Sequence, residues 1–417
     1  WGGVGSRVVG VTIRHKGSRR SAHDLTVAVK MRTLTKHASF RVVEMPERVG
    51  VGHVQVTPLM REYVNDVLDS GWLSPGKWCA RFEKEWAALH GRRYAVFMNS
   101  GTSALHVAVA ALKEKHGWQT GDKIVIPAVT FVATANVVLQ NSLKPVFVDV
   151  DPYYGMDISG PPPPDTVAVM PVHVNGQQAD MEHIMAWADL HGLAVIEDSC
   201  ECVGAAYRGH MSHGDISCYS TYSAHHVTTG VGGLACTDDP DIAALLRSVA
   251  NHGRDGIFFD ASAPTEQLVA RRFRFERQGY SYRSSEFEAA VGCAQLPGLA
   301  TELRRRRDIA DFFAETLSDL PLVLPRTRPG ADWWPMFYPV LTPRREELSI
   351  HLEEHGVETR PFLPLTCQPV YRHLVHQDDF LAAKRVNEQG LYWGCHPGMS
   401  DGDLSRIDAL VHQFFRR

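Results

Sequence analysis

The segment Tyr94-Ala-Val-Phe-Met-Asn-Ser-Gly-Thr-Ser-Ala104 is the clearest indicator of how this chain is organised. Its first half is apolar, as in a buried strand, and a Gly turn then precedes a helix that extends to Leu112. Backbone N–H groups at such a helix N-terminus can bind an anion, and the Ser and Thr hydroxyls can add to the site. A capping turn of the same composition is an alternative interpretation.

Strands alternate with helices on both sides of this segment. The chain upstream, over 58–90, has a helical pattern. Apolar runs predict strands over 94–98, 123–126, 145–149, 167–170 and 193–197. Helices or loops of crossover length separate these strands, which predicts a mostly parallel sheet with helices on both faces and right-handed crossovers.

The domain organisation follows from length and from a change of pattern near residue 300. The 417 residues are 44% hydrophobic and 22% charged, enough for one large or two modest domains. We expect a large α/β domain over 51–300 and a smaller C-terminal α+β domain over 301–417. Residues 1–50 begin with Trp1 and show no clear periodicity. We expect them to be a disordered or non-native extension, with a transit peptide as the alternative.

Composition and charge exclude several classes of function. The net charge of −4 gives no reason to expect a nucleic-acid partner. No apolar run approaches the roughly 18–20 residues that span a bilayer, so we expect no membrane segment. The 8 cysteines are scattered, as in the reduced thiols of a cytoplasmic protein. Because two adjacent histidines rarely ligate one ion, the pair His225-His226 does not predict a metal site.

Five motifs follow one another in a characteristic order. They are Asn99-Ser-Gly-Thr-Ser-Ala-Leu105, Pro127-Ala-Val-Thr-Phe131, Pro145-Val-Phe-Val-Asp-Val-Asp151, Glu197-Asp198 and Gly279-Tyr-Ser-Tyr-Arg283. Together they resemble the DegT/DnrJ/EryC1/StrS family of sugar-modifying enzymes that use pyridoxal phosphate (PLP). The resemblance covers roughly residues 56–417. It implies an α/β fold of the aspartate aminotransferase-like type, fold type I of the PLP-dependent transferases.

The resemblance also implies a role for each candidate residue. Gly101, Thr102, Ser103 and Ser220 hold the cofactor phosphate. Phe131 stacks on the pyridine ring, and Asp198 pairs with the ring nitrogen and keeps it protonated. Glu201 stands where the family usually has a Gln near the ring hydroxyl. Ser281 replaces an Asn that reaches the phosphate in the partner subunit of a homodimer, which is the expected assembly.

His225 occupies the position of the family's lysine, which binds the cofactor covalently. Imidazole cannot form that bond, although it can move protons near neutral pH. Residues 145–383 contain no lysine that could take over, and Val231 replaces the Glu of the following Gly-rich turn. A His here resembles the family's sugar 3-dehydratases, such as GDP-4-keto-6-deoxymannose 3-dehydratase, which use L-glutamate as amino donor. A second, iron–sulfur type needs cysteines that residues 237–292 lack.

Three interpretations of function therefore stay open. The first is a 3-dehydratase that acts on a 4-keto-6-deoxy sugar nucleotide, with PLP and pyridoxamine phosphate (PMP) as cofactor forms and His225 as base. The second is an aminotransferase-like enzyme that uses noncovalent PMP. The third is a non-catalytic member that binds a sugar nucleotide. Val231 and Ser281 favour the third, whereas the intact phosphate motif and Asp198 favour an enzyme.

Overall fold

The computed structural model describes residues 9–12, 26–29, 48–256, 263–362 and 365–416. The chain divides into two compact units, Trp1–Pro46 and Glu47–Arg417. The first unit contains an antiparallel strand pair, β1 (Val9–Thr12) and β2 (Thr26–Val29). Our expectation for residues 1–50 falls mostly outside the described residues, and the boundary expected at residue 300 stays a prediction.

A seven-stranded sheet forms the centre of the second unit, in the order β3-β9-β8-β7-β6-β4-β5. Its strands are β3 (Tyr94–Met98), β4 (Lys123–Pro127), β5 (Lys144–Val148), β6 (Thr166–Val169), β7 (Ala194–Asp198), β8 (Ile216–Ser220) and β9 (Gly233–Thr237). β9 runs antiparallel to both of its neighbours, and all other neighbouring pairs are parallel. The mostly parallel sheet predicted from the sequence is confirmed.

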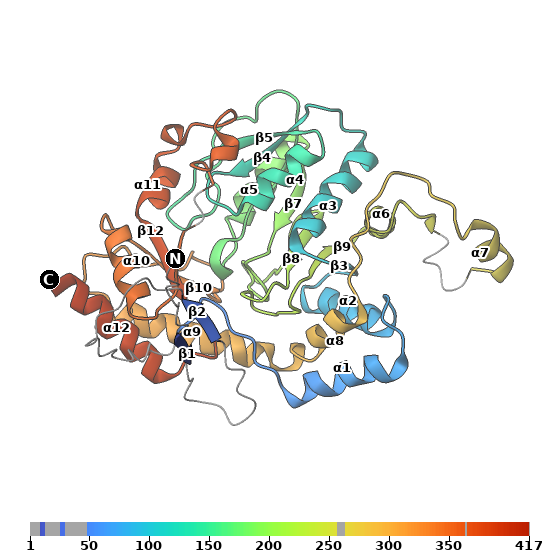
Figure 1. The fold of residues 1–417 in the computed structure, drawn as a ribbon. Coiled ribbons are helices and arrows are strands. Elements are labelled where there is room, and N and C mark those ends of the chain that lie inside the picture. Colours follow the sequence, from blue (N-terminus) through green and yellow to red (C-terminus); the bar gives the residue numbers. More distant parts are fainter. Residues whose placement is uncertain (1–8, 13–25, 30–47, 257–262, 363–364, 417) are drawn as a thin grey trace, which may run out of the picture. The chain divides into compact units, whose positions relative to one another are not determined.

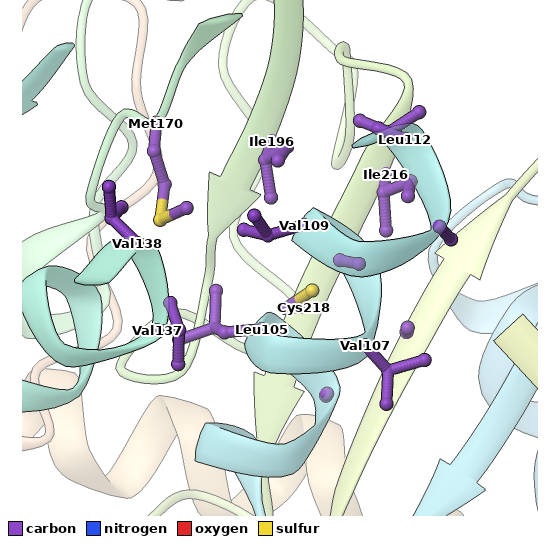
Figure 2. Close-up of a cluster of buried hydrophobic side chains, with 14 of the residues drawn as sticks. Leu105, Val107, Val109, Leu112, Val137, Val138, Met170, Ile196, Ile216 and Cys218 are labelled. Carbon is purple, nitrogen blue, oxygen red and sulfur yellow. The ribbon is translucent and has the colours of Figure 1, made fainter. Parts of the chain in front are cut away.

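Eight helices accompany this part of the chain. They are α1 (Pro58–Ser70), α2 (Lys77–Leu89), α3 (Gly101–His116), α4 (Val132–Gln140), α5 (Met181–His191), α6 (Pro240–Ala250), α7 (Thr265–Arg271) and α8 (Glu286–Cys293). α3 packs across β7, β8 and β9 (Figure 1). Leu105 and Val109 of α3 belong to the same buried hydrophobic cluster as Ile196 of β7 and Ile216 of β8 (Figure 2). The middle of α3 is buried on nearly every side and is mostly apolar, as expected for a helix covered by its neighbours.

A second sheet has the order β10-β12-β11 and is antiparallel. Its strands are β10 (Phe337–Leu341), β11 (Thr359–Pro361) and β12 (Gly390–Gly394), and the remaining helices are α9 (Leu299–Thr316), α10 (Arg345–Glu354), α11 (Leu381–Gln389) and α12 (Asp401–Arg416). Side chains of α9, α10 and α12 share one core with this sheet. None of the described helices is long and apolar enough to cross a membrane.

Two features of the second unit differ from the sequence-based expectation. The helical pattern over 58–90 is two helices, because Gly71 adopts a left-handed φ of 64° that ends α1 before α2 begins. β8 and β9 were not predicted as strands. Both are fully buried, but their short Ser-, Cys- and Gly-containing sequences lack the β-branched runs that indicate strands.

The N-terminus of α2 is capped from a distant part of the chain. Gly76 precedes the helix and has no side chain to cap it. The buried carboxylate of Glu286, at the start of α8, accepts hydrogen bonds from the N–H groups of Gly76, Trp78 and Cys79 at 2.8, 2.9 and 2.9 Å. This contact fixes α2 to α8 across more than 200 residues of sequence.

Loss of this carboxylate should destabilise the fold measurably. We expect Glu286→Ala to lower the free energy of unfolding by about 2–3 kcal/mol, because two buried and one part-buried N–H group lose a charged acceptor. Glu286→Gln keeps one acceptor oxygen and should lose roughly half as much. Urea denaturation monitored by circular dichroism measures both. Equal stability of the Ala variant and the native chain would show that water replaces the cap.

Candidate functional site

The candidate residues gather at one edge of the seven-stranded sheet. Strands β3, β4, β7 and β8 run in the same direction and all end there. Asp198 and Ser220 are the last residues of β7 and β8, and Gly101 and Phe131 follow β3 and β4. Ligands of open α/β sheets bind outside the carboxyl ends of the strands. Parallel pairing therefore brings Gly101, Phe131, Asp198 and Ser220 to a common edge, although they are far apart in sequence.

Gly101 begins α3 at a position where the backbone comes unusually close to its neighbours. A Cβ atom placed on Gly101 would lie 2.7 Å from Cβ of Ser220 and 2.8 Å from Sγ of Cys200. Gly233, which starts β9, has a similar constraint: a Cβ there would lie 2.4 Å from the Gly101 nitrogen. Only glycine at both positions allows the N-terminus of α3 to meet the ends of β8 and β9.

The other hydroxyls near this helix start have distinct surroundings. Ser100 caps α3 by accepting from the Ser103 N–H at 3.0 Å, and the Ser103 hydroxyl donates to Oδ1 of Asn99 at 2.7 Å. Thr102 is exposed, and Ser220 is buried. Because Ser103 is engaged in the cap, Thr102 and the first backbone N–H groups of α3 are the better-placed donors for an anion.

Asp198 is a buried carboxylate at the end of β7. Its Oδ2 atom accepts from the Thr134 hydroxyl at 2.8 Å, and its Oδ1 atom accepts from the Cys200 N–H at 3.2 Å. Among the described residues, no cationic side chain lies within ion-pair distance of it. Burial raises the pKa of Asp198, and these hydrogen bonds only partly offset that effect. A cation brought to this carboxylate would keep it ionised.

Phe131 precedes α4, the helix that carries Thr134. The Phe131 carbonyl accepts from the Thr134 N–H at 3.2 Å, while its aromatic side chain is 60% exposed. An exposed aromatic ring one helical turn from the residue that binds Asp198 can cover a flat ligand. Sequence reasoning did not single out Thr134, although Thr130 and Thr134 lie one turn apart directly after a strand.

Glu201 lies in the loop after β7 and accepts from the Asn175 N–H at 3.0 Å. Burial, together with the charge of Asp198, raises the pKa of Glu201 to about 7. Near neutral pH its carboxyl is therefore partly protonated and can donate a hydrogen bond, as a Gln amide does. Asn175 was also missed in the sequence. It has a left-handed φ of 52°, and its Oδ1 atom accepts from the N–H groups of Met336 and Phe337.

His225 lies in the loop between β8 and β9. Its Nδ1 atom is 2.6 Å from the Cys200 carbonyl oxygen, which can only accept, so Nδ1 carries the proton. Burial lowers the pKa of His225 to about 4. The imidazole is therefore neutral at physiological pH, and its Nε2 atom has a free lone pair. Cys200 thus connects His225 to both Gly101 and Asp198.

Ser281 stands apart from this group. It is exposed, its hydroxyl accepts from Nη2 of Arg283 at 3.1 Å, and its backbone pairs with Asn251. Within the described part of the chain it contacts none of the other candidate residues. The role implied for this position, at the phosphate site of a partner subunit, stays a prediction.

The described residues fit PLP in three respects. The glycine-lined start of α3 suits a phosphate, the exposed Phe131 ring suits a planar heterocycle, and Asp198 is a buried carboxylate without a cation. His225 can hold a proton but cannot bond covalently to the cofactor.

A Cβ atom at Gly101 should weaken cofactor binding. We expect Gly101→Ala to bind PLP about tenfold more weakly or worse, because α3 must move away from Ser220. Gly298→Ala is a matched control, since a Cβ there meets no atom within 4 Å. Titration of the unloaded protein with PLP, followed by fluorescence, measures both affinities. Unchanged affinity of the Gly101 variant would place the phosphate elsewhere.

Comparisons with known proteins identify the family of this chain. A model of the DegT/DnrJ/EryC1/StrS aminotransferase family matches residues 55–412. The chain is 33% identical over 381 residues to GDP-perosamine synthase of Caulobacter vibrioides, covering 88% of this chain and 98% of that protein.

Two solved structures are similar over most of their length. Escherichia coli GDP-4-keto-6-deoxy-D-mannose-3-dehydratase with bound hydrated PLP has a TM-score of 0.79 at 24% identity, covering 88% of this chain and 100% of that one. The aminotransferase TlmJ from Streptoalloteichus hindustanus has a TM-score of 0.78 at 26% identity, with 88% and 99% covered. The chain therefore belongs to the DegT/DnrJ/EryC1/StrS aminotransferase family of PLP-dependent enzymes.

Proposed function

We propose that this protein is a sugar-nucleotide 3-dehydratase that uses His225 as its base. The observation that carries the proposal is a neutral, backbone-anchored imidazole at the position of the family's lysine. The substrate is a 4-keto-6-deoxy sugar nucleotide, and L-glutamate is the amino donor. GDP-linked sugars are the first to test, because GDP-perosamine synthase is a relative over most of the chain.

Binding of the cofactor rests on noncovalent contacts. When bound, PLP supplies an electron sink and, in its PMP form, an amino group. The α3 N-terminus and Ser220 hold its phosphate, Phe131 covers its ring, and Asp198 pairs with the ring nitrogen. Glu201, with a pKa near 7, donates to the ring hydroxyl. Together, these contacts hold the cofactor in place, as a covalent bond to lysine does in other members of the family.

His225 moves the protons of the reaction. Its Nε2 atom has a free lone pair, because the Cys200 carbonyl keeps the proton on Nδ1. Nε2 takes up one proton as base, and the resulting imidazolium donates it to the hydroxyl that leaves C3 of the sugar. Its lowered pKa makes the imidazolium a strong acid, which suits protonation of a poor leaving group.

The lack of lysine supports this chemistry. No lysine occurs between residues 145 and 383, so no nearby amine in that span competes with the amino group of PMP. An aminotransferase-like activity with noncovalent PMP is the second candidate. It is favoured by the similarity to GDP-perosamine synthase and to the aminotransferase TlmJ.

The products distinguish these candidates. Incubation with PLP, L-glutamate and GDP-4-keto-6-deoxymannose should release equal amounts of 2-oxoglutarate and ammonia and a 3-deoxy ketosugar. Glutamate loses two electrons in this reaction, and replacement of the C3 hydroxyl by hydrogen takes them up. Mass spectrometry and an ammonia assay measure the outcome. An amino sugar without ammonia would establish the second candidate, and no reaction of glutamate or sugar would indicate a non-catalytic binding protein.

Removal of the imidazole should abolish turnover and leave the cofactor bound. We expect His225→Asn to keep PLP but to release 2-oxoglutarate from glutamate at least 100-fold more slowly, the order of magnitude of general-base catalysis. Single-turnover measurements with glutamate alone test this step. His226→Asn is a neighbouring comparison: His226 holds the loop through the Trp334 carbonyl, so its loss should slow this step less than loss of the His225 imidazole.

A lysine at the same position tests the register independently of activity. His225→Lys should trap PLP covalently after borohydride reduction, which intact-mass measurement detects. A variant that stays unlabelled while binding PLP would show that position 225 does not face the cofactor.

A further inference from the structure

Arg306, in α9, is a buried cation for which the described part of the chain provides no acidic partner. Its side chain is 3% exposed. Among the described residues, no carboxylate lies within ion-pair distance of its guanidinium. A buried charge is costly unless hydrogen bonds compensate it. The surroundings of Arg306 therefore need an explanation other than a salt bridge.

Backbone carbonyl groups from three separate parts of the chain surround this guanidinium. Nη1 donates to the carbonyl oxygens of Cys395 at 2.7 Å, Met336 at 3.0 Å and Pro335 at 3.5 Å. Nη2 donates to the carbonyl oxygen of His225 at 3.4 Å. Arg306 thus joins the start of β10 and the end of β12 to the backbone of His225.

Two further contacts hold the same loop from the same side. Gln295 accepts from the Thr228 N–H at 3.0 Å and donates to the Thr228 carbonyl at 2.6 Å. His226 Nε2 lies 2.6 Å from the Trp334 carbonyl oxygen. His225, Gln295 and Arg306 line one cavity of about 110 Å³. This cavity does not include Ser220 or Asp198, so it borders a part of the loop away from the phosphate contacts.

We propose that Arg306 is a positioning residue for His225. Arg306 fixes the backbone carbonyl group of His225 and places a permanent positive charge beside the loop that carries it. The role of His225 as base rests on the proposed function; the charge and the contact of Arg306 do not. A guanidinium stays charged under all ordinary conditions and offers several donors in one plane, which suits a site made of carbonyl groups.

The charge has a predictable consequence for the imidazole. A neighbouring positive charge disfavours the imidazolium, so Arg306 adds to burial in lowering the pKa of His225. The other titratable groups around His225 come from its own loop, from the loop after β7, from α9 and from the segment before α1. They are Tyr222, His226, Cys200, Glu302 and His53.

Two substitutions separate the charge from the geometry. Arg306→Gln removes the charge, so the midpoint of His225 protonation should rise, by less than the shift that burial imposes. Arg306→Lys keeps the charge but replaces the planar fork by a single ammonium, so the midpoint should stay and only the rate should fall. Arg305→Gln is the matched control, because Arg305 precedes Arg306 in α9 and donates instead to Met399 and Asp401.

NMR of the full chain with ¹³C-labelled histidine, with and without PLP, measures the midpoint directly. His225→Asn assigns the signal among the 21 histidines. The acidic limb of the pH profile for 2-oxoglutarate release should move by the same amount in Arg306→Gln.

An unchanged His225 midpoint in a folded Arg306→Gln protein would overturn the role of the charge. Full activity of Arg306→Lys would overturn the positioning role, and this variant serves as the test if Arg306→Gln does not fold. A shifted NMR midpoint without any reaction of glutamate would support the inference while refuting the proposed function.

Discussion

The approach of the α3 N-terminus to the ends of β8 and β9 is the constraint on which this site depends. Gly101 and Gly233 permit a backbone separation that any Cβ atom would prevent. This close packing aims the helix N-terminus at the carboxyl edge of the sheet, beside Ser220 and Cys200. The apolar body of α3, buried against β7 and β8, holds the helix in place (Figure 2). The proposed anion site is therefore a product of core packing rather than of a flexible loop.

Burial then shifts the pKa of each ionisable group at this edge. Asp198 and Glu201 are buried carboxyls whose pKa values rise, whereas His225 is an imidazole whose pKa falls. All three groups are shifted toward their neutral forms before a ligand arrives. A protonated ring nitrogen reverses this effect for Asp198 alone, because only that carboxylate is proposed to meet a cation. The same edge of the sheet can thus provide an ion-pair partner in Asp198, a hydrogen-bond donor in Glu201 and a base in His225.

The loop that carries His225 is held by groups far from it in sequence. Cys200 binds the imidazole, while Arg306 and Gln295 bind the loop backbone. Arg306 also binds carbonyl groups directly before β10 and directly after β12, so it connects the second sheet to the proposed base. A lysine bonded to the cofactor is held by that bond. A histidine lacks this covalent bond. Hydrogen bonds that anchor its loop backbone at several points can hold it in place instead.

The sequence by itself determined the α/β class, the family and the identity of the candidate residues, because these depend on local patterns and on motif order. It also showed the exchange of lysine for His225. It did not show β8 and β9 as strands, since their burial comes from neighbours on both sides rather than from their own composition. Only the tertiary structure revealed Thr134, Asn175 and Arg306 as partners of the site. Their contacts join residues up to 162 positions apart, and no local pattern records such pairings.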